Sequence, residues 1–336
     1  MKRAPFPFIN ELRENIVIGV IEWERNILMK SVVVDGATSM LGLALINECI
    51  ANRIKVLAIA RKDSRRLAHI PKSEYVEVLL CSQEHVAGLD TSALDKYEVY
   101  YHFAWGNVLA EQRRNVELQM PNIEYTLDAV ALAQRLGCRR FVGAGSQAEY
   151  GRVSGRIGPD TPVNPEVAYG VAKYAAGKMA MIRCGQLGME CIWTRTFSVY
   201  GIGDNMTTLV MYAIDKLLKG EKPSFTKAKQ RWDYLYSADA GRAFYLIGEK
   251  GRAEKVYCIG SGVSRPLYEY IYELRDAIDP GLPLGIGEIP YGPLQVMNLQ
   301  ADIRELGQDT GFAPVYSFEE GIRETVEWYR ESQGRQ

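Results

Sequence analysis

The sequence has few histidines and no paired cysteines. Three histidines occur in 336 residues, and the six cysteines stand singly along the chain. Neither an H-E-x-x-H pattern nor a C-x-x-C pair is present, which argues against a zinc site and against a disulfide scaffold. We therefore expect no metal ion, and the scattered cysteines favour a reducing compartment.

Long runs of one charge and long hydrophobic runs are also missing. The chain carries 40 Lys and Arg against 41 Asp and Glu, a net charge of −1. The sequence therefore shows no basic stripe that could bind the phosphate backbone of a nucleic acid. In residues 1–28, charged side chains interrupt every apolar run, and neither a signal peptide nor a membrane span fits. We expect a cytoplasmic globular protein that binds neither nucleic acid nor membrane. The first 28 residues are either a helix that packs on a partner or on its own domain, or a leader unrelated to the fold.

Short apolar strands alternate with helical stretches from residue 30 onward. The β-rich segments are 31–34, 55–60, 75–80, 99–103, 140–144 and 190–194. Between them, segments such as 41–52 and 123–136 carry apolar residues at helical spacing. This alternation predicts an α/β fold with a Rossmann-type, doubly wound parallel sheet.

The alternation loosens after residue 197, where Gly, Pro and Tyr become frequent. We read this part as a smaller C-terminal α/β lobe that holds the substrate. The predicted organisation is an N-terminal extension (1–28), a dinucleotide-binding domain (29–196, with 234–260 returning to it), and a substrate-binding lobe (197–233 and 261–333).

A glycine-containing turn follows the first predicted strand and precedes a helix. Gly36 permits a tight turn, and Gly42 lets helix and strand pack closely. The helix N-terminus offers free N–H groups to a pyrophosphate. The turn therefore predicts dinucleotide binding, with residues 38–41 lying between the two glycines at the phosphates.

The end of the second predicted strand is basic. An NAD site places an acidic residue about 20 residues past the turn, but Arg61 stands there, with Ser64 and Arg65 close behind. An arginine binds a 2′-phosphate bidentately, whereas a carboxylate repels it. We therefore expect NADP(H) in preference to NAD(H); the alternative is that this cluster is a solvated loop.

A tyrosine and a lysine four residues apart suit proton transfer. Tyr169 and Lys173 share one face of a predicted helix. A tyrosine titrates near pH 10, and a nearby ammonium stabilises its phenolate. Ser146 follows the fifth strand, at the sheet edge where active sites lie, and could donate a second hydrogen bond to a substrate oxygen.

Taken in order, these motifs resemble the extended short-chain dehydrogenase/reductases, a family of nucleotide-sugar epimerases, dehydratases and reductases. Further matching segments are 101–104, 195–201, 232–239 and 310–314. The resemblance implies that Ser146, Tyr169 and Lys173 form the catalytic triad. It also implies that Phe103, Ala104 and Trp105 flank the cofactor, and that Phe197 to Val199 meet the nicotinamide.

The candidate site residues fall into three groups. Three are catalytic: Ser146, Tyr169 and Lys173. The cofactor-binding set comprises Gly36, Thr38, Ser39, Met40, Leu41, Gly42, Arg61, Ser64, Phe103, Ala104, Trp105, Tyr169, Lys173, Phe197 and Val199. The substrate-binding set comprises Trp105, Gln147, Ser198 and Arg231.

Departures from the family pattern narrow the activity. Ser39 replaces the usual middle glycine of the turn. Gln147 and Ala148 stand where the 4,6-dehydratases of the family carry the Asp and Glu that move protons during water loss, so we expect no dehydration. Arg231 lies one place before the arginine that clamps the substrate diphosphate in many relatives; it either binds that group or faces solvent.

The residues and the resemblance together predict an NADP(H)-dependent oxidoreductase that reduces a nucleotide-linked sugar, most specifically a 4-keto-6-deoxyhexose. The first alternative is an NAD-dependent nucleotide-sugar 4-epimerase, and the second is a non-catalytic dinucleotide-binding regulator. The family often dimerises through two long helices, which 123–136 and 171–186 could supply, so we also expect a homodimer.

Overall fold

The computed structural model describes residues 29–333, and a seven-stranded parallel sheet forms its centre. The sheet order is β11-β6-β5-β4-β1-β2-β3, the doubly wound arrangement of a Rossmann fold with one added strand. The strands are β1 Ser31–Asp35, β2 Lys55–Ala60, β3 Val76–Leu80, β4 Val99–His102, β5 Arg140–Ser146, β6 Glu190–Thr196 and β11 Val256–Ile259. The predicted fold class is confirmed.

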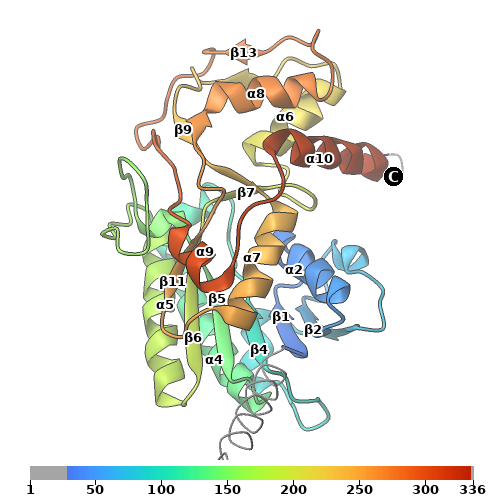
Figure 1. Ribbon diagram of the computed structural model, residues 1–336, viewed down its shortest axis with the longest axis vertical. Coiled ribbons are helices and arrows are strands. Elements are labelled where there is room, and N and C mark those ends of the chain that lie inside the picture. Colours follow the sequence, from blue (N-terminus) through green and yellow to red (C-terminus); the bar gives the residue numbers. More distant parts are fainter. Residues whose placement is uncertain (1–28, 334–336) are drawn as a thin grey trace, which may run out of the picture.

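Helices cover both faces of the sheet (Figure 1). On one face lie α2 (Met40–Ala51) and α7 (Ser237–Lys250), and on the other lie α4 (Pro121–Arg135) and α5 (Ala168–Gln186). Successive residues of a strand point to opposite faces, so Val32 packs with α2 and α7 while Val33 packs with α4. Burial on both faces explains why the central strands are apolar throughout.

A smaller group of elements lies above the sheet in Figure 1. Its helices are α6 (Leu209–Leu218), α8 (Leu267–Asp276) and α10 (Phe318–Gln333), and they share a separate apolar core. Short strands accompany them: β7 Ser198–Tyr200, β8 Ser224–Phe225, β9 Arg231–Trp232, β10 Tyr234–Tyr236, β12 Arg265–Pro266 and β13 Gly285–Ile286. The remaining short helices are α3 (Val116–Gln119) and α9 (Arg304–Thr310).

A buried aspartate ties distant segments together in this upper part. The Asp233 carboxylate accepts hydrogen bonds from the backbone N–H groups of Ser261 (2.8 Å), Gly262 (3.0 Å) and Ala301 (2.9 Å). These bonds satisfy the fully buried side chain of Asp233. They also join its own segment, between β9 and β10, to the loop at 261–262 and to the segment at Ala301.

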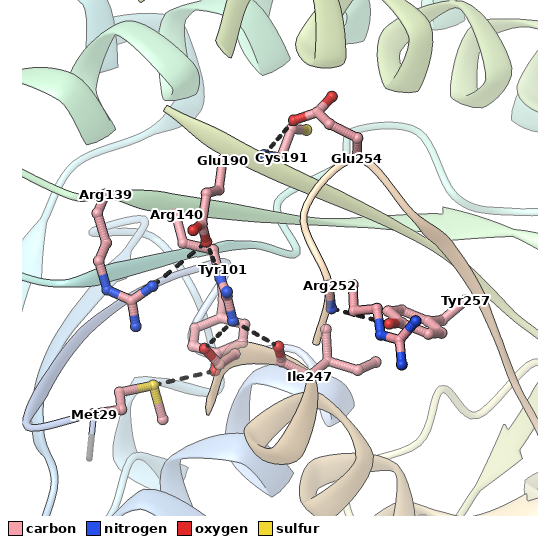
Figure 2. A network of polar contacts seen from close by, with 11 residues as sticks. Met29, Tyr101, Arg139, Arg140, Glu190, Cys191, Ile247, Arg252, Glu254 and Tyr257 are labelled. Atoms are coloured by element: carbon pink, nitrogen blue, oxygen red, sulfur yellow. Dashed lines mark hydrogen bonds and ion pairs between the residues drawn. The ribbon is translucent and has the colours of Figure 1, made fainter. Parts of the chain in front are cut away.

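A polar network fixes the edge of the sheet at which β5 and β6 begin (Figure 2). Arg140, which is buried, donates to Glu190 (2.6 Å) and to the carbonyls of Ile247 (3.2 Å) and Gly248 (2.7 Å). These carbonyls belong to the last turn of α7, where a cation is favourable. The network holds α7 onto the sheet at the end opposite Ser146 and the other candidate catalytic residues.

The boundaries differ from those predicted in a few places. Strands β5 and β6 continue to Ser146 and Thr196, because the two strands stay paired to their ends. Helix α4 begins at Pro121, which suits the first helical turn because proline has no N–H to leave unpaired. Residues 1–28, for which the sequence left two interpretations, lie outside the described residues.

Candidate functional site

The turn between β1 and α2 has the geometry of a phosphate cradle. Gly36 has a φ of +81°, and a Cβ there would lie 2.5 Å from the backbone nitrogen of Ala104. A Cβ on Gly42 would lie 2.5 Å from the Gly36 carbonyl oxygen. Ser39 replaces the expected middle glycine as the N-cap of α2, and its hydroxyl accepts a hydrogen bond from Gly42 N–H (3.0 Å). The backbone could therefore approach a pyrophosphate closely at the positive end of α2.

A pocket of about 590 Å³ opens beside this turn. Its walls come from the ends of β1, β2 and β4, so it lies at the carboxyl edge of the sheet where such folds bind dinucleotides. Among the candidate cofactor residues, eight line it: Gly36, Thr38, Ser39, Arg61, Ser64, Phe103, Ala104 and Trp105. Met40, Leu41 and Gly42 lie in the first turn of α2 next to it.

The basic residues after β2 divide into two groups. The Arg61 side chain is 63% exposed, lines the pocket, and lies 3.9 Å from the Asp63 carboxylate. Ser64 donates to Thr38 of the phosphate turn (3.1 Å), which joins the two loops. Arg66 also lines the pocket, but its guanidinium already donates to the carbonyls of Gly203 (2.8 Å) and Asp204 (3.2 Å).

The three candidate catalytic residues come together at the ends of β5 and α5. Ser146 ends β5, and its hydroxyl accepts from the Ala148 N–H (3.2 Å). Tyr169 and Lys173 lie in the first two turns of α5, and the Lys173 ammonium donates to the Ala144 carbonyl of β5 (2.6 Å). Gly170 allows α5 to pack closely on the turn after Ser146, because a Cβ there would lie 2.3 Å from the Ala148 carbonyl oxygen.

Trp105 links these residues to the pocket. Its ring faces the Lys173 ammonium, with Nζ 3.6 Å from the centroid, and it meets the Tyr169 ring edge-on at 6.0 Å. Its indole N–H donates to the side-chain amide oxygen of Gln119, Oε1 (3.0 Å), and Gln119 is buried. The candidate cofactor residue Trp105 therefore contacts two of the three candidate catalytic residues.

Burial changes the proton affinity of the Tyr–Lys pair. Burial lowers the pKa of Lys173 to about 7, although the Glu149 carboxylate opposes this shift; Arg113 adds to it. Burial also raises the pKa of Tyr169, against the effects of Arg113 and of the Ser146 hydroxyl. A phenol that keeps its proton and a lysine that titrates near neutrality are suited to passing a proton to a substrate oxygen.

A buried ion pair between Glu149 and Arg195, which was not predicted from the sequence, holds the turn after Ser146 in place. Glu149 is fully buried, and its carboxylate accepts from Ser146 N–H (2.9 Å), Trp193 Nε1 (3.1 Å) and Arg195 Nε (2.8 Å). The Arg195 guanidinium also stacks on the Tyr150 ring at 4.5 Å. The available signal was Arg195 itself, a charged residue that directly follows the predicted strand 190–194 and is buried in β6.

Two further groups at the site were not predicted. The Asp35 carboxylate is hydrogen-bonded to His102 Nδ1 (2.8 Å), both residues are buried, and Asp35 lines the pocket. Arg113 lies with its guanidinium carbon 4.8 Å from the Tyr169 ring centroid. For the first group the sequence showed only a lone histidine near the end of a predicted strand, and for the second only an arginine in a polar stretch.

The remaining candidates do not line the cofactor pocket. Phe197 is buried in a small core with Tyr150, and Val199 packs against the core on the α2 side. Ser198 begins β7, and Gln147 begins the 3-10 turn after Ser146. Arg231 is exposed on β9, and its guanidinium donates to the Ser264 carbonyl and to the Ser264 hydroxyl (3.3 Å).

Residues 29–333 contain neither a metal-ligand cluster nor a membrane-spanning helix. Within this range no three His, Cys, Asp or Glu side chains are grouped so that they could hold a metal ion. No helix in the same range combines the length and the apolar character that crossing a bilayer requires.

Comparisons with known proteins identify the family of the chain. A family model described as the NAD dependent epimerase/dehydratase family matches residues 32–260. A dTDP-glucose 4,6-dehydratase from Streptomyces niveus is 26% identical over 272 residues, which are 79% of each chain. A protein of the same name from Xanthomonas campestris is 27% identical over 205 residues, 58% of each chain.

Solved structures share the fold at low sequence identity. A UDP-N-acetylglucosamine 4-epimerase from Methanobrevibacter ruminantium superposes with a TM-score of 0.81 at 19% identity, covering 90% of this chain and 99% of that one. A dTDP-glucose 4,6-dehydratase from Streptomyces venezuelae, solved with NAD bound, gives 0.79 at 20% identity, covering 91% and 98%. The expected absence of dehydratase activity gains no support here, because the curated relatives just described are named 4,6-dehydratases.

Proposed function

Because the chain belongs to the NAD-dependent epimerase/dehydratase family, we propose that it is a nucleotide-sugar oxidoreductase that uses NADP(H) to reduce a 4-keto-6-deoxyhexose nucleotide. The observation that carries this proposal is the meeting of Ser146, Tyr169 and Lys173 beside a pocket whose turn can cradle a pyrophosphate. A reduced dinucleotide bound there would supply the hydride.

The chain's own residues would bind and protonate the carbonyl oxygen of the substrate. Tyr169 keeps its proton because its burial raises its pKa, so its hydroxyl can donate that proton as the oxygen gains negative charge. The Ser146 hydroxyl lies beside Tyr169 and would donate a second hydrogen bond to the same oxygen. Lys173 stands one turn further along α5 and would hold the ribose of the dinucleotide.

The preference for NADP(H) rests on the loop after β2. Arg61 lines the pocket with a largely free guanidinium, and Ser64 is held against the phosphate turn through Thr38. These groups could bind a 2′-phosphate. Asp63 lies near Arg61 and would weaken the attraction, so the preference is expected to be moderate.

The absence of dehydration also belongs to the proposal. Gln147 and Ala148 carry no ionisable group at the two positions after Ser146. The carboxylate of Glu149 follows at once, but it is buried and bound to Arg195, Trp193 and Ser146. It is therefore poorly placed to exchange protons with a substrate.

A homodimer in the cytoplasm completes the proposal. Val171, Met179 and Ile182 are exposed on α5, and Met120 is exposed just before α4, which gives an apolar face of the kind that a second copy covers. The six cysteines are unpaired, as a reducing compartment requires.

The test begins with the cofactor that leaves the protein on denaturation. We expect little tightly held NAD, and we expect oxidation of added NADPH with 4-keto-6-deoxyhexose nucleotides of at least one base. Tyr169→Phe should abolish turnover and keep cofactor affinity. One equivalent of released NAD together with no NADPH consumption would overturn the reductase in favour of a 4-epimerase, and inactivity with every sugar nucleotide would favour a binding regulator. Formation of a 4-keto-6-deoxy product from a nucleotide hexose would contradict the exclusion of dehydration.

A further inference from the structure

We propose that Arg113 is a positioning residue for proton transfer, whose guanidinium, stacked on the Tyr169 ring, supplies the permanent positive charge that stabilises the phenolate. This inference rests on the proposed role of Tyr169 as the proton donor and adds a second cation to the Tyr–Lys pair. Arg113 lies in the β4–α4 connection, residues 103–120, of which only residues 103–105 carry predicted cofactor contacts.

The geometry places Tyr169 between an aromatic ring and a cation. The Arg113 guanidinium carbon lies 4.8 Å from the Tyr169 ring centroid. The Trp105 ring meets Tyr169 edge-on, with the planes at 84°. The Lys173 ammonium is further from the Tyr169 centroid, at 6.0 Å, and lies much closer to Trp105. Arg113 is therefore the cation nearer to the ring of Tyr169.

The Lys173 ammonium has other partners. It donates to the Ala144 carbonyl at 2.6 Å and faces the Trp105 ring at 3.6 Å, and the side chain is 3% exposed. Burial lowers the pKa of Lys173 to about 7, so above that pH the side chain is neutral for most of the time. An arginine keeps its charge throughout this range. A charge that is needed at the phenolate above neutral pH is thus more securely supplied by Arg113.

The other groups that face Tyr169 do not replace this charge. Ser146 lowers the pKa of Tyr169 by hydrogen bonding, whereas the Glu149 carboxylate raises it. Glu149 is already paired with Arg195, which limits its effect. Lys173 and Arg113 are then the two cations near the Tyr169 ring, and the Arg113 charge lowers the pKa of Lys173 further.

The connection is built to hold Arg113 in place. The Arg113 Nε donates to the Val108 carbonyl (2.7 Å). The buried Gln119 amide donates to the carbonyls of Asn107 (2.8 Å) and Gln112 (3.2 Å), while its oxygen receives the Trp105 N–H. One side chain thus organises both ends of the segment, so Trp105 and Arg113 are positioned together.

The experiment follows the titration of Tyr169 directly. Tyrosine labelled with ¹³C at Cζ gives a signal that reports ionisation, and Tyr169→Phe identifies the one that belongs to Tyr169 among 20 tyrosines. In Arg113→Gln we expect the pKa of Tyr169 to rise by about one pH unit, the effect of one partly solvated charge at roughly this distance. Arg113→Lys should recover part of the shift. Arg114→Gln, which removes the neighbouring charge from a separate groove lined by Val171 and Ala172, should leave the titration unchanged.

Kinetics provide the second readout. In Arg113→Gln, the loss of reduction at high pH, where Tyr169 gives up its proton, should move up by about one unit, and kcat should fall up to about tenfold because the acid is weaker. An unchanged Tyr169 titration would overturn the inference. A raised KM with an unchanged pH profile would also overturn it and make Arg113 a substrate anchor. Activity in Tyr169→Phe would instead refute the proposed function, since the titration of Tyr169 does not depend on turnover.

Discussion

Replacing Glu149 with glutamine tests the buried ion pair under the Ser146 turn. The glutamine has the same shape, and its carbonyl oxygen can keep the bonds from Ser146 N–H and Trp193 Nε1 that the Oε1 atom now accepts. Its amide group would take the place of Oε2 and would face the Arg195 Nε, which lies 2.8 Å from that oxygen. Two donors would then meet where a donor and an acceptor meet now.

The expected loss follows from the burial of both partners. The Glu149 and Arg195 side chains are 0% and 6% exposed. Breaking a buried pair by removing one charge costs about 3–5 kcal/mol, because the other charge stays buried and unpaired. Arg195 keeps its bond to the Pro159 carbonyl (3.2 Å) and its stack on Tyr150, so we expect about 3 kcal/mol, at the lower end.

Urea unfolding followed by tryptophan fluorescence measures this loss, since Trp193 belongs to the network. The matched control is Glu319→Gln, which breaks the exposed pair with Arg323 and should cost less than about 1 kcal/mol. The double variant Glu149→Gln/Arg195→Met should recover at least half of the loss, because no charge remains buried. A loss below about 1 kcal/mol for Glu149→Gln, or a double variant less stable than the single one, would refute this account.

Three further predictions concern the cofactor site and Lys173. Arg61→Asp should shift the ratio of kcat/KM for NADPH and NADH about tenfold or more toward NADH, and an unchanged ratio would show that the loop is merely solvated. Gly42→Ala should abolish dinucleotide binding measured by calorimetry, because the new Cβ would lie 2.5 Å from the Gly36 carbonyl oxygen; retained affinity would contradict the close packing. Burial lowers the pKa of Lys173 from 10.5 to about 7, so between these values the unfolded chain binds more protons than the folded chain, and this residue makes stability rise with pH by up to about 1.4 kcal/mol per unit. Lys173→Met should remove that rise in urea unfolding at pH 7.5 and 9.5, and an equal rise in both proteins would refute the shift.

Most strands of the sheet could be predicted from the sequence because they are short, continuous apolar runs. Strand β1 and strand β2 are short apolar runs between turns, and each is buried on both faces, so no polar face confuses the pattern. The seventh strand, β11, was not identified as a strand. Its four residues, Val256–Ile259, give too short a pattern, and its place next to β6 is set by tertiary pairing.

The sequence predicted those site residues that belong to local motifs. Tyr169 and Lys173 are four residues apart on one helix, and the strand that ends at Ser146 is paired with its neighbour, so their meeting follows from the fold. Arg113 and Gln119 belong to an irregular connection whose course depends on hydrogen bonds to its own backbone. No periodicity marks such contacts, so only the folded chain shows that Arg113 reaches the Tyr169 ring.

The turn after Ser146 bears directly on the proposed absence of dehydration. A carboxylate is present in this turn, at Glu149, yet the fold directs it inward, to Arg195 on β6 and to the backbone of Ser146. A carboxylate whose oxygens already accept from a buried guanidinium, a tryptophan N–H and a backbone N–H is poorly placed to exchange protons with a substrate. The acid of this turn therefore fixes the position of Ser146. In the proposed reductase, the neutral side chains of Gln147 and Ala148 would leave Tyr169 as the proton donor. Overall resemblance to proteins named dehydratases is compatible with this arrangement, because the sheet and the phosphate turn do not depend on these two side chains.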